Sequence, residues 1–165
     1  MKLYVASDLD FDPETAWEIF ESDEYGRRLE QATDLVCTVL SEGRDGDIAT
    51  RHVRYVSKRE LPGMVAKALG SKSLTYEQHN RFDAARSRMD WRVVIPASDR
   101  VQVSGITTIT ATPTGSRRVV DGDITVQVRL IGGQIEKAVV AEFERSMRRA
   151  VDLVRQIHDE RSAEG

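Results

Sequence analysis

Apolar and polar residues alternate along most of the middle of the chain, as in β-strands that bury one face. Short turn signals, of which Asp45-Gly46 is the strongest, separate about six such runs. The expected strands cover residues 33–41, 47–58, 73–82, 85–95, 101–112 and 117–130. A shorter apolar run at 2–7 adds an expected edge strand. Because each long strand follows the previous one across a turn, the pattern predicts an antiparallel meander.

Helical patterns flank this strand region. Asp12 followed by Pro13 is a helix start signal, because aspartate caps a helix well and proline suits its first position. A second short helix is expected over 23–31. Apolar residues then recur every third or fourth position over 134–159, which predicts one long amphipathic helix. Its apolar stripe comprises Ile135, Val139, Phe143, Met147, Ala150, Val154 and Ile157.

Composition narrows the class of protein. The 165 residues include 27 acidic and 24 basic side chains, and the formal net charge is −3. A single domain over 1–160 with a frayed polar tail at 161–165 is expected. No apolar run approaches the ~20 residues of a membrane span, and the mild acidity argues against nucleic-acid binding. One cysteine, Cys37, and the lack of an apolar signal sequence favour a cytoplasmic protein.

The order of the predicted elements favours a ligand-binding architecture. A long antiparallel sheet twists and curls, so its concave face can hold one long amphipathic helix and leave room for a small molecule. Two segments, Glu60-Leu61-Pro62-Gly63-Met64 and Gly132-Gly133-Gln134-Ile135-Glu136-Lys137, resemble an uncharacterised branch of the START-like, or SRPBCC, superfamily. The resemblance implies an α+β helix-grip (Bet v 1-like) fold with a curved sheet of about seven strands wrapped on the C-terminal helix. It also implies a cavity for a hydrophobic molecule such as a lipid, sterol or polyketide.

Alternation assigns side chains to the face of the sheet that meets the long helix. The strand expected at 85–95 directs Ala85 to that face together with Ser87, Met89 and Trp91. The candidate ligand-binding residues are Tyr55, Met64, Leu74, Tyr76, Gln78, Asn80, Ser87, Met89, Trp91, Thr107, Val139, Phe143 and Met147. Their polar members either satisfy one another in a core network or anchor a ligand. The sequence leaves both alternatives open.

The apolar segment 61–70 lies between two expected strands and is predicted to form a short amphipathic helix over the opening of the cavity. In one interpretation Met64, Val65 and Leu69 form a gate that moves on a hinge at Gly132-Gly133. In the other, the segment is a fixed lid.

Motifs for catalysis or metal binding do not stand out. The histidines His52, His79 and His158 are far apart in sequence, and Cys37 has no candidate base beside it. No catalytic residue, metal site or cofactor is therefore assigned. The basic residues expected on the outer face are Arg54, Lys58, Arg81, Arg86, Arg88 and Arg92. Cross-strand pairing with Glu77 and Asp90 is favoured over a role in binding a partner.

The leading functional prediction is binding, with transport as an extension, of a hydrophobic small molecule or lipid. One alternative is an enzyme of the polyketide cyclase or dehydratase type. Another is a protein-interaction domain with a filled core. A transient contact with a membrane or a protein, and either a monomeric or a dimeric state, are compatible with the sequence.

Overall fold

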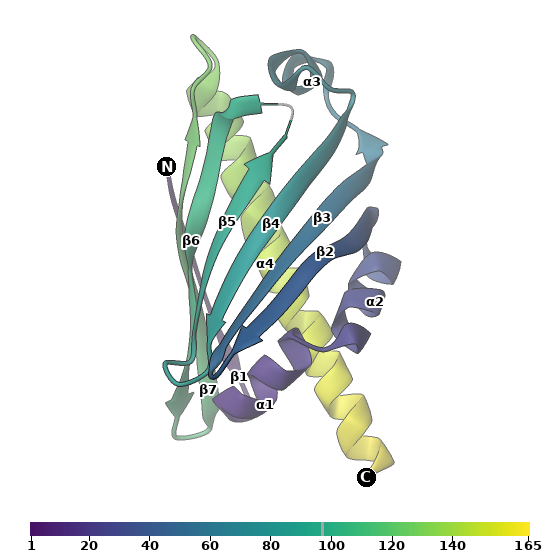
Figure 1. Cartoon of the computed structure of the whole chain (residues 1–165), viewed down its shortest axis with the longest axis vertical. Coiled ribbons are helices and arrows are strands. Elements are labelled where there is room, and N and C mark those ends of the chain that lie inside the picture. The colour runs from purple at the N-terminus through teal and green to yellow at the C-terminus, as the bar shows by residue number, and fades with distance from the viewer. Residues whose placement is uncertain (97) are drawn as a thin grey trace.

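A single antiparallel sheet wraps around a long helix in the computed structural model, which describes residues 1–96 and 98–165 (Figure 1). The strands are β1 (Lys2–Leu9), β2 (Leu35–Asp45), β3 (Ile48–Glu60), β4 (Ser73–Asp83), β5 (Arg88–Ile95), β6 (Ser98–Thr112) and β7 (Gly115–Val126). The helices are α1 (Pro13–Phe20), α2 (Asp23–Ala32), α3 (Gly63–Leu69) and α4 (Gly132–Glu164). The seven strands lie in the order β1-β7-β6-β5-β4-β3-β2. The predicted helix-grip architecture is confirmed.

Local sequence signals set the first helices and the first hairpin. Asp12 caps α1, where its carboxylate accepts a hydrogen bond of 2.7 Å from the Thr15 amide. Ser22 caps α2 in the same way by accepting from the Tyr25 amide. Gly46 has a φ of 57° in the turn between β2 and β3, a conformation that glycine adopts without steric cost. Strand β2 runs closer to this turn than alternation predicted, because its pairing with β3 continues to Asp45, opposite Ile48.

Three sequence predictions need correction. The strand expected from residue 85 begins at Arg88, so Ala85 is exposed and Ser87 lies in the turn before β5. The last strand ends at Val126 instead of 130, and Leu130 projects fully into solvent with a φ of 70°. The tail does not fray at 161, because α4 continues to Glu164 and Arg161 pairs with two glutamates of α1 and α2.

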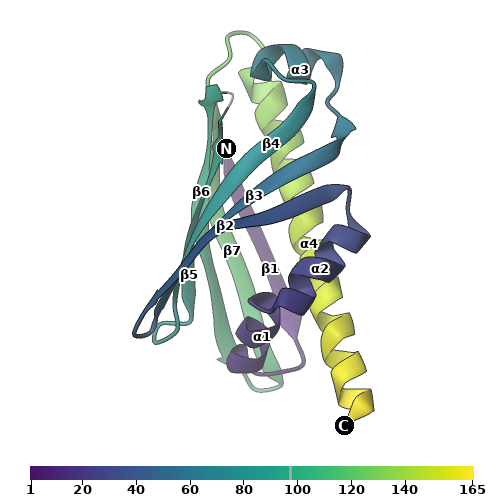
Figure 2. The same cartoon turned by 45° about the vertical axis from the view of Figure 1, so that its right-hand side comes forward.

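The core lies between α4 and one side of the sheet. Helix α4 packs on β1 and β7, and its C-terminal half carries most of its buried residues. Leu3, Ile124, Val154 and Ile157 are completely buried there. Helices α1 and α2 cross the end of the molecule nearest the C-terminus, and α2 contacts both β2 and α4 (Figure 2). Helix α3 lies at the opposite end, beside the N-terminal end of α4.

Trp91 fills the centre of the sheet's inner face. Two glycines on neighbouring strands make room for its indole, since a Cβ at Gly105 would lie 2.5 Å from Trp91 Cζ2 and one at Gly122 would lie 3.0 Å from Cη2. The indole Nε1 donates a 3.1 Å hydrogen bond to the Thr107 hydroxyl. Close packing of this kind holds β5, β6 and β7 at a fixed spacing.

Candidate functional site

The inner face of the sheet is buried at β6 and β7 but mostly only half-buried at β3 and β4. Val120 of β7 and Ile109 of β6 are completely buried. Most inward side chains of β3 and β4 are half-buried instead, with Val53 as the buried exception, and so are the apolar residues at the middle of α4. We call these facing side chains the inner surface, and they are Tyr55, Leu74, Tyr76, Phe82, Val139, Phe143 and Met147. The two rows of apolar side chains therefore face each other without completing their burial.

Two tyrosines stand at the centre of the inner surface. Tyr55 and Tyr76 are directly opposite on β3 and β4, and their rings stack. Burial raises the pKa of both phenols far above the ordinary value, and the nearby Tyr25 of α2 contributes to each shift. Burial also raises the pKa of Tyr25, to about 12. All three phenols are therefore neutral at physiological pH and can donate hydrogen bonds.

Cys37 lies beside this tyrosine group on β2, directly opposite Tyr55. Burial and the carboxylate of Glu30 raise the pKa of its thiol to about 11. Because the thiolate is the nucleophilic form, a protonated thiol of this kind is unreactive at neutral pH.

Arg118 projects from β7 into the same region, with only 8% of its surface exposed. Its guanidinium carbon lies 4.7 Å from the centre of the Phe20 ring, and its Nη2 lies 3.5 Å from the Met147 sulfur. Its Nη1 is buried without a hydrogen-bond partner among the described residues. Burial lowers the pKa of Arg118 to about 10, which leaves the group charged at neutral pH. Desolvating such a cation costs on the order of several kcal/mol, of which one cation–π contact recovers about 1 kcal/mol.

Arg118 was missed by sequence reasoning. Alternation places it two residues before the buried Val120, on the inner face of the strand, and that position was the signal available. An arginine in a row of inward valines and isoleucines is costly to bury, so it marks a polar site on an apolar face.

Two of the predicted polar residues belong to a core network. Ser87 accepts a 2.7 Å hydrogen bond from the Trp17 indole and donates to the Ile109 carbonyl. The Thr107 hydroxyl accepts a hydrogen bond from the indole of Trp91. For these two side chains the structure fits the core-network alternative, because their hydrogen-bonding groups are used within the protein.

The remaining predicted residues differ in how deeply their side chains are buried. Gln78 and Asn80 lie on the inner face of β4 and bond to each other at 2.8 Å, which leaves further donors and acceptors on both amides. Met89 and Trp91 are buried in the core. Leu74 is half-buried and lies nearer to α3.

Helix α3 does not bring its apolar residues to the inner surface as a group. Met64 is 59% exposed, whereas Val65 is half-buried and packs against the core. The side chain of Leu69 lies outside the described part of the structure. At the expected hinge, a Cβ on Gly132 would lie 2.7 Å from the Val126 carbonyl oxygen, so this glycine is closely packed, while Gly133 has open space around it.

The outer face of the sheet holds a second group of side chains. His52 and His79 are opposite each other on β3 and β4, and their rings stack with centroids 3.9 Å apart. Glu77 lies within metal-ligating reach of both histidines. However, its carboxylate already accepts hydrogen bonds from His52 and from two nitrogens of Arg54. A metal ion at Glu77 would compete with the proton of His52 and would lie close to the positive charges of Arg54 and Arg92.

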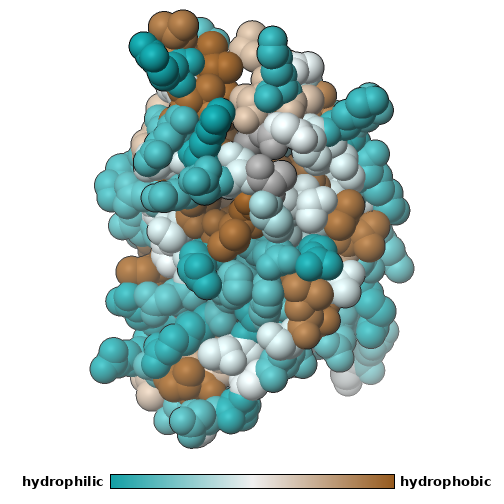
Figure 3. Space-filling view, turned by 45° about the horizontal axis from the view of Figure 1, so that its top comes forward, coloured by the Kyte–Doolittle hydropathy of each residue, from teal (hydrophilic) through white to brown (hydrophobic). Residues whose placement is uncertain are grey.

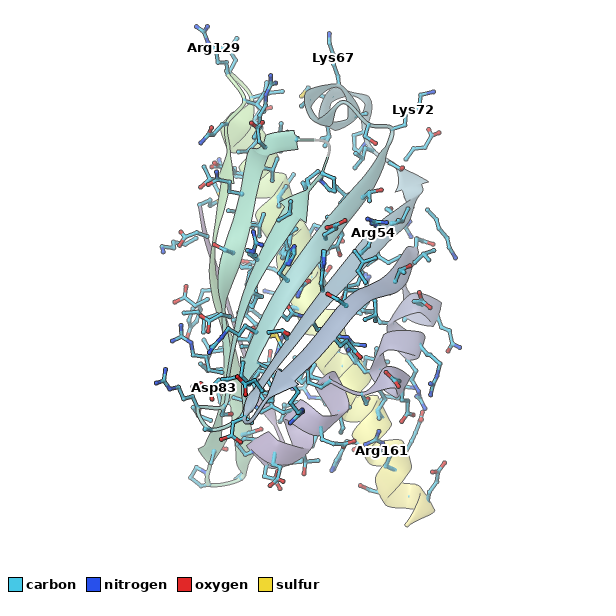
Figure 4. The ribbon with its side chains drawn as sticks, in the orientation of Figure 1. Arg54, Lys67, Lys72, Asp83, Arg129 and Arg161 are labelled. Carbon is cyan, nitrogen blue, oxygen red and sulfur yellow. The ribbon has the colours of Figure 1, made fainter. Side chains whose placement is uncertain are left out.

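The histidine pair lines a groove of about 420 Å³ on this outer face, and a second groove of about 480 Å³ lies over β5, β6 and β7. Hydrophilic residues dominate the face shown in Figure 3, with hydrophobic ones in separate patches. Arg54, labelled over the sheet in Figure 4, pairs with Glu77 of the neighbouring strand, and Arg88 pairs with Asp90 of β5. The cross-strand pairing expected for the outer arginines is confirmed for Arg54 with Glu77, whereas Arg88 pairs with Asp90 along its own strand.

None of the helices in the described residues combines the length and apolar character needed to cross a membrane.

Comparison with known proteins identifies the fold and the family. The profile of a family described as "Protein of unknown function (DUF2505)" matches residues 5–157. No curated protein matches the chain. Among solved structures, the Zhui aromatase/cyclase from Streptomyces sp. R1128 is similar, with a TM-score of 0.70, 16% identity and coverage of 98% of this chain and 95% of that one.

Two further structures support the same fold. The protein TTHA0849 from Thermus thermophilus gives a TM-score of 0.67 at 13% identity and covers 94% of this chain and 95% of its own. Ara h 8.0201 gives a TM-score of 0.65 at 11% identity, with coverage of 95% and 96%. At these identities the similarity shows a shared architecture.

Proposed function

The chain belongs to the DUF2505 family within the START-like superfamily, and we propose that it binds a hydrophobic small molecule at the inner surface. One observation carries the proposal. Apolar side chains on β3, β4 and the middle of α4 face one another while only half-buried, although the neighbouring strands are packed to completion. Covering such a surface with an apolar ligand is favourable by about 25 cal/mol per Å².

The tyrosines support a ligand with some polar character. The hydroxyls of Tyr55 and Tyr76 make no hydrogen bond within the described residues, so they are available to an occupant of the inner surface. Gln78 and Asn80 offer further donors and acceptors on the same strand. Mostly apolar walls with a few polar groups are typical of small-molecule sites. As an extension of this proposal, the protein transports the bound molecule within the cell.

A cyclase or dehydratase activity is the second candidate, and one observation favours it besides the name of the Zhui structure. Burial raises the pKa of Glu21, at the end of α1, while the nearby Arg51 opposes the shift. A carboxyl group with a raised pKa is a candidate general acid. Binding is the leading proposal because Glu21 lies near Tyr25 and Arg51 and no reacting partner for it is seen among the described residues.

The binding proposal is tested with a neutral apolar probe, N-phenyl-1-naphthylamine, whose fluorescence rises in apolar surroundings. Val139→Trp places a large side chain on the inner surface, and Lys137→Trp places the same side chain on the exposed side of α4. We expect saturable binding to the wild type, a loss of roughly tenfold or more in affinity for Val139→Trp, and wild-type binding for Lys137→Trp.

Native mass spectrometry of freshly purified protein, followed by organic extraction, identifies any bound molecule. A stoichiometric apolar adduct supports binding. A bare mass together with no saturable probe binding would overturn the proposal and favour a domain that contacts proteins. Turnover of a polyketide analogue, lost in Glu21→Gln but not in Glu14→Gln, would establish the enzymatic alternative instead.

A further inference from the structure

Resting on the proposed function, we propose that Arg118 binds the carboxylate of an amphipathic ligand whose apolar body lies along the inner surface. The guanidinium stands at the end of the inner surface nearest α1 and α2, between Phe20, Tyr25 and Met147. The apolar residues Phe143 and Val139 follow along α4 toward α3. An acid with a long apolar tail would place its head at Arg118 and its tail against these side chains.

The surroundings of Arg118 lack an acidic partner among the described residues. Its contacts are an aromatic ring and a thioether, and the titratable group that acts on it is the Tyr25 phenol, which is neutral at physiological pH. Other arginines near the helices differ. Arg51 lies 3.0 Å from Glu42, and Arg161 pairs with both Glu18 and Glu24. Arg118 is thus a buried cation whose charge is not balanced by the protein side chains around it.

A carboxylate matches this vacant bonding capacity in shape as well as in charge. The two terminal nitrogens of a guanidinium form a planar fork that binds both oxygens of a carboxylate. Among the described residues, Nη1 has no hydrogen-bond partner and Nη2 donates only to the Met147 sulfur, which is a weak acceptor. Methionine is flexible and Met147 is half-buried, so its side chain can move aside for a stronger acceptor.

Tyr25 completes the recognition of the head group. Its phenol is neutral at physiological pH because burial raises its pKa to about 12. A neutral phenol donates a hydrogen bond and so adds to the attraction of the guanidinium for an anion. A neutral ligand of the same length would gain the apolar contacts without these charge-assisted hydrogen bonds.

The test compares dodecanoate with 1-dodecanol, which has the same alkyl chain and an uncharged head. Each compound displaces N-phenyl-1-naphthylamine from the wild type, from Arg118→Met and from the control Arg54→Met, whose arginine lies on the outer face. We expect the wild type and Arg54→Met to prefer dodecanoate by about tenfold or more. Arg118→Met should bind both compounds with similar affinity and keep the wild-type affinity for 1-dodecanol.

The outcomes separate the two proposals. Equal binding of both compounds to the wild type, or a preference that survives in Arg118→Met, would overturn the role of Arg118 while the inner surface stays a binding site. If the wild type shows no saturable binding of the probe and binds neither dodecanoate nor 1-dodecanol, both proposals are overturned.

A measurement on the wild type avoids dependence on the folding of a variant. Dodecanoate labelled with ¹³C at its carboxyl carbon reports its own ionisation by chemical shift. Contact with the guanidinium should hold the pKa of the bound acid below that of the free acid. An unshifted or raised pKa of the bound acid would contradict the proposal.

Arg118→Lys, which keeps the charge but lacks the planar fork, should retain part of the preference for dodecanoate over 1-dodecanol.

Discussion

Tyr55 and Tyr76 lie opposite each other on β3 and β4, and their rings stack with centroids 4.9 Å apart and planes 18° from parallel. The stack forms the floor of the inner surface. Its rings provide apolar contact area, and its two hydroxyls remain free to bond an occupant. The pair therefore serves packing through its rings and recognition through its oxygens, and the two roles can be tested separately.

Tyr76→Phe should leave the fold almost as stable as the wild type. The substitution removes a hydroxyl that bonds to no described residue, so we expect the free energy of unfolding to change by less than about 0.5 kcal/mol. Urea denaturation measures this quantity. Tyr76→Ala, which removes the stacked ring, should cost about 2–3 kcal/mol. A large loss for the phenylalanine variant would show that the hydroxyl is bonded within the protein.

Alkaline pH should destabilise the protein through its buried tyrosines. The pKa of Tyr25 is raised from 10.0 to about 12 on folding, and those of Tyr55 and Tyr76 are raised further. The unfolded chain therefore loses phenolic protons above pH 10 while the folded chain retains them, so stability is fully present below pH 10 and falls as the pH rises toward 12. Denaturation at a series of pH values, with tyrosinate absorbance followed in parallel, checks this. A tyrosinate signal that develops fully near pH 10 without unfolding would contradict it.

Gly105→Ala should disrupt the centre of the sheet. The new methyl group would lie 2.4 Å from the Asp121 carbonyl oxygen and 2.5 Å from the Trp91 ring, so backbone or indole must shift. We expect a loss of about 1–3 kcal/mol in urea denaturation and a change in tryptophan fluorescence. Gly133→Ala is the matched control, because nothing lies within 4 Å of its added Cβ. It should be neutral or stabilise α4 by up to about 1 kcal/mol. Equal effects at the two positions would argue against close packing at Trp91.

Helix α3 should exchange its amide hydrogens faster than the buried part of α4. The seven residues of α3 have no side-chain cap at their start, and Met64 faces solvent. In α4, by contrast, Val151, Val154 and Ile157 are completely or almost completely buried. Hydrogen exchange read by mass spectrometry should show early exchange over 63–69 and late exchange over 150–157. Comparable protection in the two segments would support a fixed lid and remove the basis for a gate at α3.

Most of the fold could be predicted from the sequence because its signals are local. Alternation gave the strands, the cap at Asp12 gave the first helix, and the apolar stripe gave the last one. The failures came where local pattern and tertiary contact disagree. Residues 85–87 continue the alternation of β5, yet they form the turn because Ser87 bonds to Trp17 and Ile109 from far along the chain.

The candidate site could be predicted only in part. The strand pattern was enough to direct Tyr55 and Tyr76 inward. It could not show that Ser87 and Thr107 use their hydroxyls within the core, since both bonds join distant elements. It also did not reveal how His52 meets His79, which depends on the register of β3 against β4. Arg118 was overlooked because its neutral surroundings come from α1, α2 and α4 rather than from its own strand.

The position of β1 constrains how the chain folds during its synthesis. Lys2 and Asp123 pair across 121 positions, and the partner strand of β1 is the last strand of the sheet. Leu3 and Val5 leave the ribosome before β7 and α4, the elements that cover them. The apolar side chains of β1 therefore stay uncovered until β7 and α4 have been made, and β1 can complete its pairing only after β7 has emerged. Such distant pairing slows folding and makes protection of the first strand a condition for reaching the native state.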